Sequence, residues 1–194
     1  MFRLPLCELR CALSYNKHMN IKRVLIVLAG IAVAGLLIAG GFALSNILKP
    51  KDNPVPASIS SQIDYTPLVI PANVETLKTS DYKVSAVEDG TKLLSYIIHI
   101  DDATVTVSEY TQPSQFADVP DFKDKFLENV IQKTTSVSTA NGTIILGQQA
   151  KQQNKQLAVM LERGLVVLMN PSKTLEQKQW RTIGDALEVI KPSN

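Results

Sequence analysis

The chain has 194 residues, 45% of them hydrophobic, and a formal net charge of +2 at pH 7. From Asp52 onward, 13 Lys and Arg residues stand against 17 Asp and Glu, so this larger part has a charge balance of −4. A mildly acidic region argues against a nucleic-acid groove, which needs clustered cations facing the phosphates. We therefore expect no nucleic-acid partner.

Residues 24–44 form an unbroken apolar stretch without charge or proline. A helix of this length, at a ~1.5 Å rise per residue, covers roughly the ~30 Å hydrocarbon thickness of a bilayer. Five basic residues precede the stretch and Glu8 is the only acid there, which predicts a cytoplasmic N-terminus and an extracytoplasmic C-terminus. We expect a cytoplasmic tail at 1–23, and a transmembrane helix or signal anchor at 24–48 that places the chain in the cell membrane.

Two alternatives concern this N-terminal region. A cleaved signal peptide would also begin with a basic segment, and Ala43 and Ser45 are small residues at a suitable spacing for cleavage. The apolar run, however, exceeds the ~7–15 residues of a usual signal peptide core, which favours a retained anchor. Met19 is an alternative start, which would make the first 18 residues an over-extension of the reading frame.

The two cysteines, Cys7 and Cys11, both lie in the tail. They could supply half of a zinc site, but zinc takes four ligands and only His18 is near them in sequence. We therefore predict no metal and no cofactor. Within the anchor, small residues repeat every four positions, a spacing that lets membrane helices approach closely and that would suit a weak homodimer. They are Gly35, Ala39 and Ala43.

Residues 49–64 contain Pro50, Pro54 and Pro56 and a serine-rich end, a composition typical of a semi-extended linker. We expect the folded extracytoplasmic domain to span 65–194. Its first strands are predicted at 82–87, 91–100 and 103–110, where apolar and polar residues alternate with period two. Glu88-Asp89-Gly90 and Asp101-Asp102 are the expected turns between them.

Asp121 is placed to cap a helix whose apolar stripe runs from Phe122 to Ile131, after a loop at 113–120. Strands follow at 134–139, 143–149, 157–161 and 165–169, with Asn141-Gly142 as a strong hairpin turn. A capping box at 174–177 begins a last helix that reaches Ile190. The predicted fold is α+β: a curved antiparallel sheet of about six strands with two helices packed on one face.

The arrangement of four segments is similar to that of a known group of proteins. These segments are Tyr65-x-Pro67-x-x-x-Pro71, the strand 105–109, Gly142-x-x-x-x-Gly147, and the helix from Trp180 to Leu187. Over about 65–190 the chain resembles bacterial single-pass membrane-anchored extracytoplasmic proteins of unknown function. That resemblance implies an N-terminal anchor, a proline-rich linker and one compact β-rich domain. It implies no catalytic residue.

Catalytic chemistry has one candidate arrangement outside the tail. His99 could act as a general base oriented by Asp101 or Asp102, with Ser95 or Ser108 as nucleophile. Neither serine has the flanking glycines of a nucleophile elbow, so we expect His99 to be a solvated strand-end residue and name no catalytic residue. The acids could bind calcium, but adjacent aspartates more often serve a turn.

Three further features have a structural and a functional interpretation. Glu109 shares the strand face of Val105 and Val107, where a carboxylate is unexpected unless the face opens or a partner such as a lysine meets it. We expect a structural role there. Trp180 could line a groove, but its helical spacing favours the core. The glutamine-rich segment 147–156 is the candidate surface for a partner, as an exposed loop or hairpin tip.

Two functions follow. The first is a non-enzymatic module, tethered to the membrane, that binds or senses a protein, a peptide or an envelope component. The alternative is a tethered hydrolase or small-ligand carrier with its site between the sheet and the helices. A deep apolar pocket bordered by His99 and an acid would favour that alternative, and a filled core with a shallow surface would count against it.

Overall fold

The computed structural model describes residues 53–87, 89–150 and 152–190. Apart from the short turn at 87–90, these residues belong to one compact unit. The predicted tail, membrane helix, cysteine pair and small-residue series all lie outside the described residues. Among the helices that the structure describes, none is long and apolar enough to cross a membrane.

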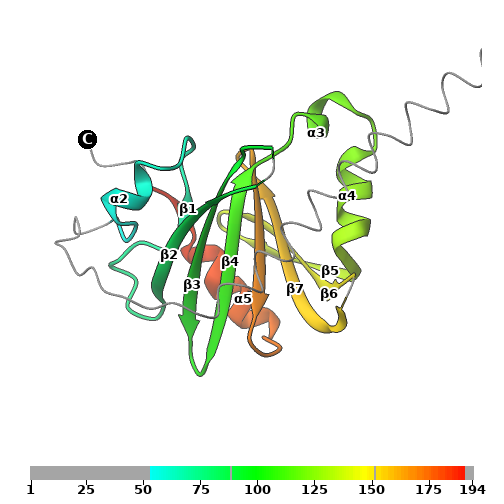
Figure 1. Cartoon of the computed structure of the whole chain (residues 1–194). Coiled ribbons are helices and arrows are strands. Elements are labelled where there is room, and N and C mark those ends of the chain that lie inside the picture. Colours follow the sequence, from blue (N-terminus) through cyan, green and yellow to red (C-terminus); the bar gives the residue numbers. More distant parts are fainter. Residues whose placement is uncertain (1–52, 88, 151, 191–194) are drawn as a thin grey trace, which may run out of the picture. The chain divides into compact units, whose positions relative to one another are not determined.

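Seven antiparallel strands form one sheet in the order β2-β3-β4-β8-β7-β6-β5 (Figure 1). They are β2 (Lys78–Ala86), β3 (Lys92–Ile100), β4 (Ala103–Thr111), β5 (Ile131–Thr139), β6 (Gly142–Gln149), β7 (Gln152–Glu162) and β8 (Leu165–Pro171). Two short strands, β1 (Leu68–Val69) and β9 (Glu188–Val189), pair separately. The described part of the chain also has four helices. The α+β class and the antiparallel sheet are therefore confirmed; the seven strands of the large sheet coincide with the seven predicted segments, although the sheet was expected to have about six strands.

The period-two patterns of β3 and β4 place their apolar residues on one face, as the sequence predicts. Tyr96 pairs with Val107 and Ile98 with Val105, and all four side chains are at most 1% exposed. Because cross-strand partners point to the same side of a sheet, these residues form a continuous apolar surface. The expected turn at Asp101-Asp102 joins the strands, with Asp101 in the left-handed region at a φ of 50°.

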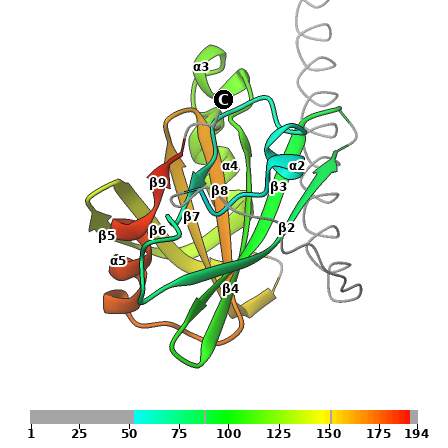
Figure 2. The same cartoon turned by 90° about the vertical axis from the view of Figure 1, so that its left-hand side faces the viewer.

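One helix, α5 (Gln177–Ala186), closes this apolar surface. It contacts β5 and β6 (Figure 2) and places Trp180 and Ile183, both fully buried, in the core cluster. Trp180 is therefore a core residue, and its indole N–H finds no hydrogen-bond partner among the described residues. The prediction that two helices pack on this face is correct for α5 and wrong for α4 (Phe122–Val130). The one buried residue of α4 is Phe126, and no residue of α4 belongs to the core cluster.

Both ends of α5 differ from the prediction. The capping box joins Glu176 and Gln179, whose amide oxygen accepts the Glu176 N–H at 3.0 Å, two residues later than expected. The helix ends at Ala186 because the next residues pair as β9 with β1, which leaves Ile190 beyond the helix and its N–H on the Pro67 carbonyl. A long-range strand pair has here replaced a locally favourable helical turn.

The α4 helix begins after Asp121, but the Asp121 side chain does not cap it. That residue has a φ of 60° and makes no side-chain cap hydrogen bond, so the predicted cap is wrong. The predicted loop before it contains a short helix, α3 (Gln115–Asp118), whose Phe116 ring lies 5.6 Å from that of Phe122 and 5.2 Å from that of Phe126. Ile131 belongs to β5 rather than to the helical stripe.

Part of the predicted linker packs against the domain. Val55 is 2% exposed and belongs to the core cluster, and the short helix α2 (Ala57–Ser60) contacts β2. The Asn53 side chain accepts the Val55 N–H at 2.9 Å, which fixes the chain as it enters the fold. The packed part of the chain therefore extends back at least to Asn53 and does not begin at Tyr65.

Candidate functional site

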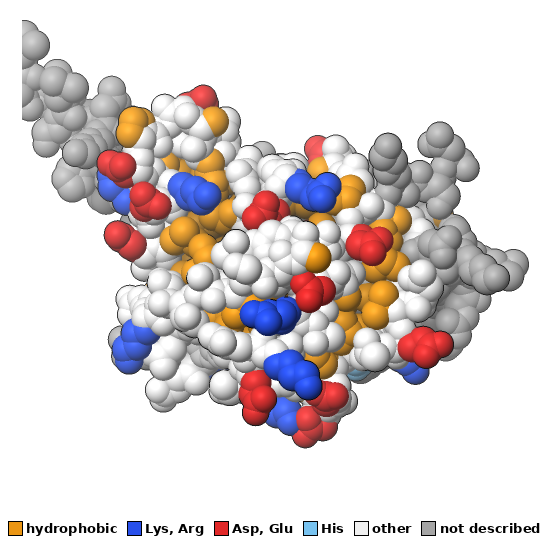
Figure 3. Space-filling view, turned by 180° about the vertical axis from the view of Figure 1, so that it is seen from behind, with side chains coloured by type: hydrophobic (Ala, Val, Ile, Leu, Met, Phe, Trp, Pro, Cys, Tyr) orange, Lys and Arg blue, Asp and Glu red, His pale blue; other side chains and the backbone are white. Residues whose placement is uncertain are grey.

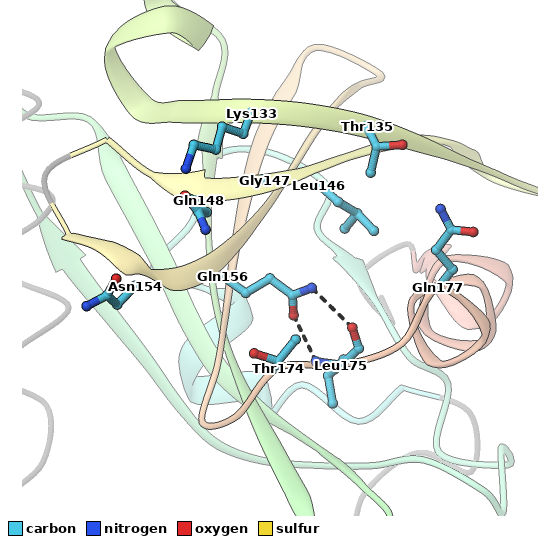
Figure 4. Close-up of a pocket in the computed structure, with 10 residues that line it drawn as sticks. All are labelled: Lys133, Thr135, Leu146, Gly147, Gln148, Asn154, Gln156, Thr174, Leu175 and Gln177. Carbon is cyan, nitrogen blue, oxygen red and sulfur yellow. Dashed lines mark hydrogen bonds between the residues drawn. The ribbon is translucent and has the colours of Figure 1, made fainter.

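A pocket of about 310 Å³ lies where the β6–β7 hairpin meets β5 and the segment that leads into α5 (Figure 4). We call it the polar pocket, because amide and hydroxyl side chains dominate its lining. Its residues are Lys133, Thr135, Leu146, Gly147, Gln148, Asn154, Gln156, Thr174, Leu175 and Gln177. Five of the ten come from the glutamine-rich segment 147–156 or its immediate neighbour Leu146, so the sequence identified one wall of the pocket.

Gln156 fixes the segment that forms the opposite wall. Its side-chain amide donates to the Leu175 carbonyl at 3.1 Å and accepts the Leu175 N–H at 2.9 Å (Figure 4). This paired contact imitates the two hydrogen bonds of a β-ladder, and it holds Leu175 in place just before the helix. Leu175 and Leu146, 3% and 4% exposed, are the apolar residues of the lining.

A β-bulge shapes the wall formed by β5 and β6. The register of this strand pair shifts between Gln132 and Thr135, and Lys133 has a φ of 51°, uncommon for a residue with a side chain. Gly147 of β6 lies against the bulge. A Cβ atom at that position would be 2.4 Å from the Gln132 carbonyl oxygen, so only glycine allows the close approach. The bulge gives the strand a local bend beside the pocket.

Six side chains of the polar pocket make no hydrogen bond to another residue that the structure describes. They are Lys133, Thr135, Gln148, Asn154, Thr174 and Gln177. Their amides and hydroxyls both donate and accept, and Lys133 is the one charged group among the ten lining residues. The lining holds no carboxylate, imidazole or thiol, so its own residues suit the recognition of a polar molecule better than acid–base or nucleophilic chemistry.

The proposed catalytic residues do not come together. Ser95 and Ser108 are buried cross-strand partners with their hydroxyl oxygens 3.5 Å apart. His99 lies four residues beyond Ser95 along β3, roughly 13 Å at a strand's rise per residue, and its Nε2 is 2.9 Å from the Ser80 hydroxyl. None of these residues lines the polar pocket. The geometry gives neither serine a base.

The two turn aspartates hold the β3–β4 turn to other elements. The Asp101 carboxylate accepts from the Gln179 side chain at 2.7 Å, and Asp102 forms an ion pair with Lys173. The hydrogen bond from Lys173 lowers the pKa of Asp102. Nowhere in the described part of the chain do three or more His, Cys, Asp or Glu side chains gather as metal ligands would.

Glu109 lies on the apolar face, as the sequence predicts, and is completely buried. Its partner is neither a lysine nor solvent: both carboxyl oxygens are 3.2–3.3 Å from the Leu68 N–H. Loss of hydration raises the pKa of Glu109 to about 8, while the Leu68 hydrogen bond opposes that rise. The carboxyl is therefore mostly neutral at pH 7.

Two tyrosines complete this arrangement, which we call the Glu109 cluster and define as Tyr65, Leu68, Tyr96 and Glu109. The Tyr65 hydroxyl donates to the Glu109 carbonyl at 2.7 Å and accepts the Leu94 N–H at 3.1 Å. The Tyr96 hydroxyl donates to the Leu68 carbonyl at 2.8 Å. Burial, and then the nearby Glu109, raise the pKa of both tyrosines. These contacts hold β1 and the residues just before it, from Tyr65 onward, against the sheet, so the cluster has a structural role.

The face of the molecule that Figure 3 shows has no dominant charge. On the face seen in Figure 3, acidic and basic side chains are interspersed with small apolar areas. Comparison with protein-family models, with curated proteins and with solved structures gives no match for this chain. The case for a function therefore depends on the polar pocket and its surroundings.

Proposed function

We propose that the protein is a single-pass membrane protein whose α+β domain, on the extracytoplasmic side, binds a polar molecule in the polar pocket without transforming it. The observation that carries this proposal is the set of six side chains around Leu146 and Leu175 that hydrogen-bond to no described residue. Ligand pockets typically join an apolar surface to a few polar groups that fix orientation, and about 310 Å³ is at the small end of their range.

The membrane location is the second part of the proposal. It is supported by the apolar stretch 24–44, by the basic residues before it and by the proline-containing segment after it. The layout resembles that of anchored extracytoplasmic domains of unknown function, and within that layout the domain would meet peptides or envelope components. Protease added to intact cells should remove everything after residue 51, whereas protection of that region would reverse the topology.

A tethered hydrolase finds less support. The core is filled around Trp180 and Tyr96, which are at most 1% exposed, and His99 does not line the polar pocket. The lining of the polar pocket has no carboxylate that could act as a base. We therefore retain the binding module as the proposed function.

The binding proposal is tested with the full-length chain in lipid nanodiscs and three probes: chitotetraose, a soluble muropeptide, and a seven-residue peptide of threonine and valine with a central glutamate. Fluorescence or calorimetric titration should detect binding of at least one probe. The double variant Gln148→Ala/Gln177→Ala should weaken that binding at least tenfold, while the exposed pair Gln62→Ala/Glu128→Ala should not change it. Binding that is unaffected by the pocket variant, or no binding of any probe, would contradict the proposal.

A further inference from the structure

The large sheet has two edges, β2 and β5, and in the described residues each of them pairs on one side only. An edge strand presents unpaired backbone N–H and C=O groups, with which another chain can pair. Natural proteins usually protect such an edge with charges, bulges or covering segments. The two edges of this sheet differ in how many of these protective features they have.

The β2 edge is protected. It contains three charged residues within six positions, Lys78, Asp81 and Lys83. Its pairing with β3 shifts between Ser80 and Lys83, with Asp81 at a φ of 57°, so the strand is bent in its middle. The helix α2 also contacts it. A second strand could not follow this edge over its length.

The β5 edge also contacts helices, α4 just before it in sequence and α5 at its far end, and it has a bulge at Lys133, but beyond that bulge it carries neither a charge nor a second irregularity. After Lys133, residues 134–139 are Thr-Thr-Ser-Val-Ser-Thr, without charge, glycine or proline and rich in β-branched side chains. Residues 132–136 and Ser138 are exposed. From Thr135 to Thr139 the pairing with β6 runs without interruption, so the outer backbone of this stretch is regular.

The far end of β5 is held rigidly. Asp185 of α5 accepts the Ala140 N–H at 2.7 Å, and the Asn141 side chain donates to the Gly184 and Asp185 carbonyls at 3.3 and 3.1 Å. A Cβ atom on Gly184 would be 2.5 Å from the Thr139 methyl group, which shows how closely the helix approaches. An edge that is fixed in advance loses less conformational entropy when a strand is added.

The same strand supplies one wall of the polar pocket. Lys133 and Thr135 line the pocket with Gln148 of the neighbouring strand (Figure 4). A polypeptide lying along β5 would direct alternate side chains to each face of the sheet, so one series would reach the pocket rim. Lys133 is the one cation of the lining, and an acidic side chain is its natural complement.

We propose that β5 is a site of strand addition for an extended, otherwise uncharged peptide segment whose one acidic side chain lies beside Lys133. Backbone pairing supplies the affinity and the polar pocket supplies the selectivity, the division of roles found in β-augmentation. The inference rests on the proposed function and narrows it, because it selects a peptide over a glycan or muropeptide as the ligand.

The test uses the full-length chain in nanodiscs and three forms of the seven-residue threonine–valine peptide. The first has a central glutamate, the second a central glutamine, and the third keeps the glutamate but carries N-methyl groups on alternate residues. The glutamate form should bind, and N-methylation should abolish binding because it removes backbone donors. Equal binding of the N-methylated form would overturn strand addition.

A matched pair of charge reversals locates the site. Lys133→Glu on β5 should weaken binding of the glutamate peptide at least tenfold and leave the glutamine peptide nearly unchanged. Lys78→Glu, an exposed lysine on the opposite edge, should change neither. An equal loss for both variants would overturn the placement on β5.

Three other outcomes would also overturn the inference, in distinguishable ways. If no peptide binds but chitotetraose or the muropeptide does, and Gln148→Ala/Gln177→Ala abolishes that binding, the proposed function stands and strand addition fails. If no probe binds, both fail. A concentration-dependent dimer that Ser136→Pro, but not Ser85→Pro, abolishes would assign the β5 edge to a second copy of this chain.

Discussion

The Glu109 cluster and the polar pocket use polar side chains in opposite ways. In the cluster, Tyr65, Tyr96 and Glu109 are engaged with backbone groups of β1 or of the sheet, at 2.7–3.3 Å. In the polar pocket, six side chains bond to nothing else that the structure describes. Most buried polar groups are satisfied within the protein, with the Trp180 indole N–H as the exception among the described side chains, whereas an accessible side chain without a partner can bond to a ligand. The comparison therefore separates residues that hold the fold from residues that are free to bind.

The largest expected loss of stability comes from a substitution in the core that both regions share. One cluster of buried residues joins Leu94 and Tyr96 near Glu109 to Ile144 and Leu146 near the pocket, and Trp180 packs within it. Trp180→Ala should lower the free energy of unfolding by about 3–5 kcal/mol, because it leaves a large cavity. Denaturant titration measures the loss. A loss below about 1 kcal/mol would show that α5 is not integral to the core, and Arg181→Ala at the exposed neighbour is the control.

Proton binding to Glu109 should give stability a pH dependence of a few kcal/mol. The pKa rises from an ordinary value of 4.5 in the unfolded chain to about 8 in the folded one. Between these values the unfolded chain loses its proton first, so the free energy of unfolding falls as pH rises from about 4.5 to 8. A tenfold difference in proton affinity between the folded and unfolded chains corresponds to ~1.36 kcal/mol.

The substitution Glu109→Gln should flatten this dependence while keeping an acceptor for the Leu68 N–H. Denaturant titrations at pH 5, 6.5 and 8 measure it, with Glu128→Gln at an exposed position of α4 as the matched control. If the wild type and Glu109→Gln show the same pH slope, Glu109 is not the neutral buried acid described above.

A smaller loss of stability is expected when the contacts that hold residues 65–68 against the sheet are weakened. Tyr65→Phe removes the hydroxyl that bridges the Glu109 carbonyl and the Leu94 N–H, and should cost about 1–3 kcal/mol because it leaves buried backbone groups without partners. Hydrogen exchange should speed up at residues 65–70. Tyr82→Phe, which loses only a bond to the Thr79 hydroxyl, should cost less. Equal losses would mean that the Tyr65 bridge contributes nothing special.

The smallest expected change in stability comes from substituting two glutamines that are cross-strand partners, Gln148 and Gln156. Gln156→Ala should lower the free energy of unfolding by about 0.5–1.5 kcal/mol, because both Leu175 backbone groups lose their partner at a part-buried position that water can reach. Gln148→Ala should stay within about 0.5 kcal/mol of the wild type, because this half-buried side chain makes no hydrogen bond to a described residue that would be left without a partner. Thermal denaturation of both variants decides it. A larger loss of stability for Gln148→Ala than for Gln156→Ala would contradict the distinction between residues that stabilise the fold and residues that are free to bind a ligand.

Local patterns in the sequence located the seven strands of the large sheet and placed Glu109 and Trp180, but β2, β5 and β7 each begin three to five residues before the predicted start, and β1 and β9 were not predicted. Alternation predicted β3 and β4, and Asn141-Gly142 marked the β5–β6 hairpin. Contacts between distant residues were not predictable in this way. The partner of Glu109 is a backbone N–H 41 positions earlier, and the end of α5 depends on the pairing of β9 with β1.

The candidate site was predictable only in part, for the same reason. The segment 147–156 was recognised as a polar surface, but Thr174 and Leu175 of the pocket come from the segment that leads into α5, and Gln177 is the first residue of that helix. Lys133 carried no local signal, because the bulge that contains it depends on Gly147 in the next strand.

Hydrogen–deuterium exchange of the full-length chain, with and without the glutamate peptide, tests the central claim most directly. The claim is that the sheet binds a peptide at its β5 edge, beside the polar pocket, whereas the Glu109 cluster stabilises the fold. We expect slower exchange at residues 132–138 of β5 and at 146–148, and unchanged exchange along β2 at 78–86. Bound peptide that leaves β5 unprotected, or that protects β2 instead, would contradict the account.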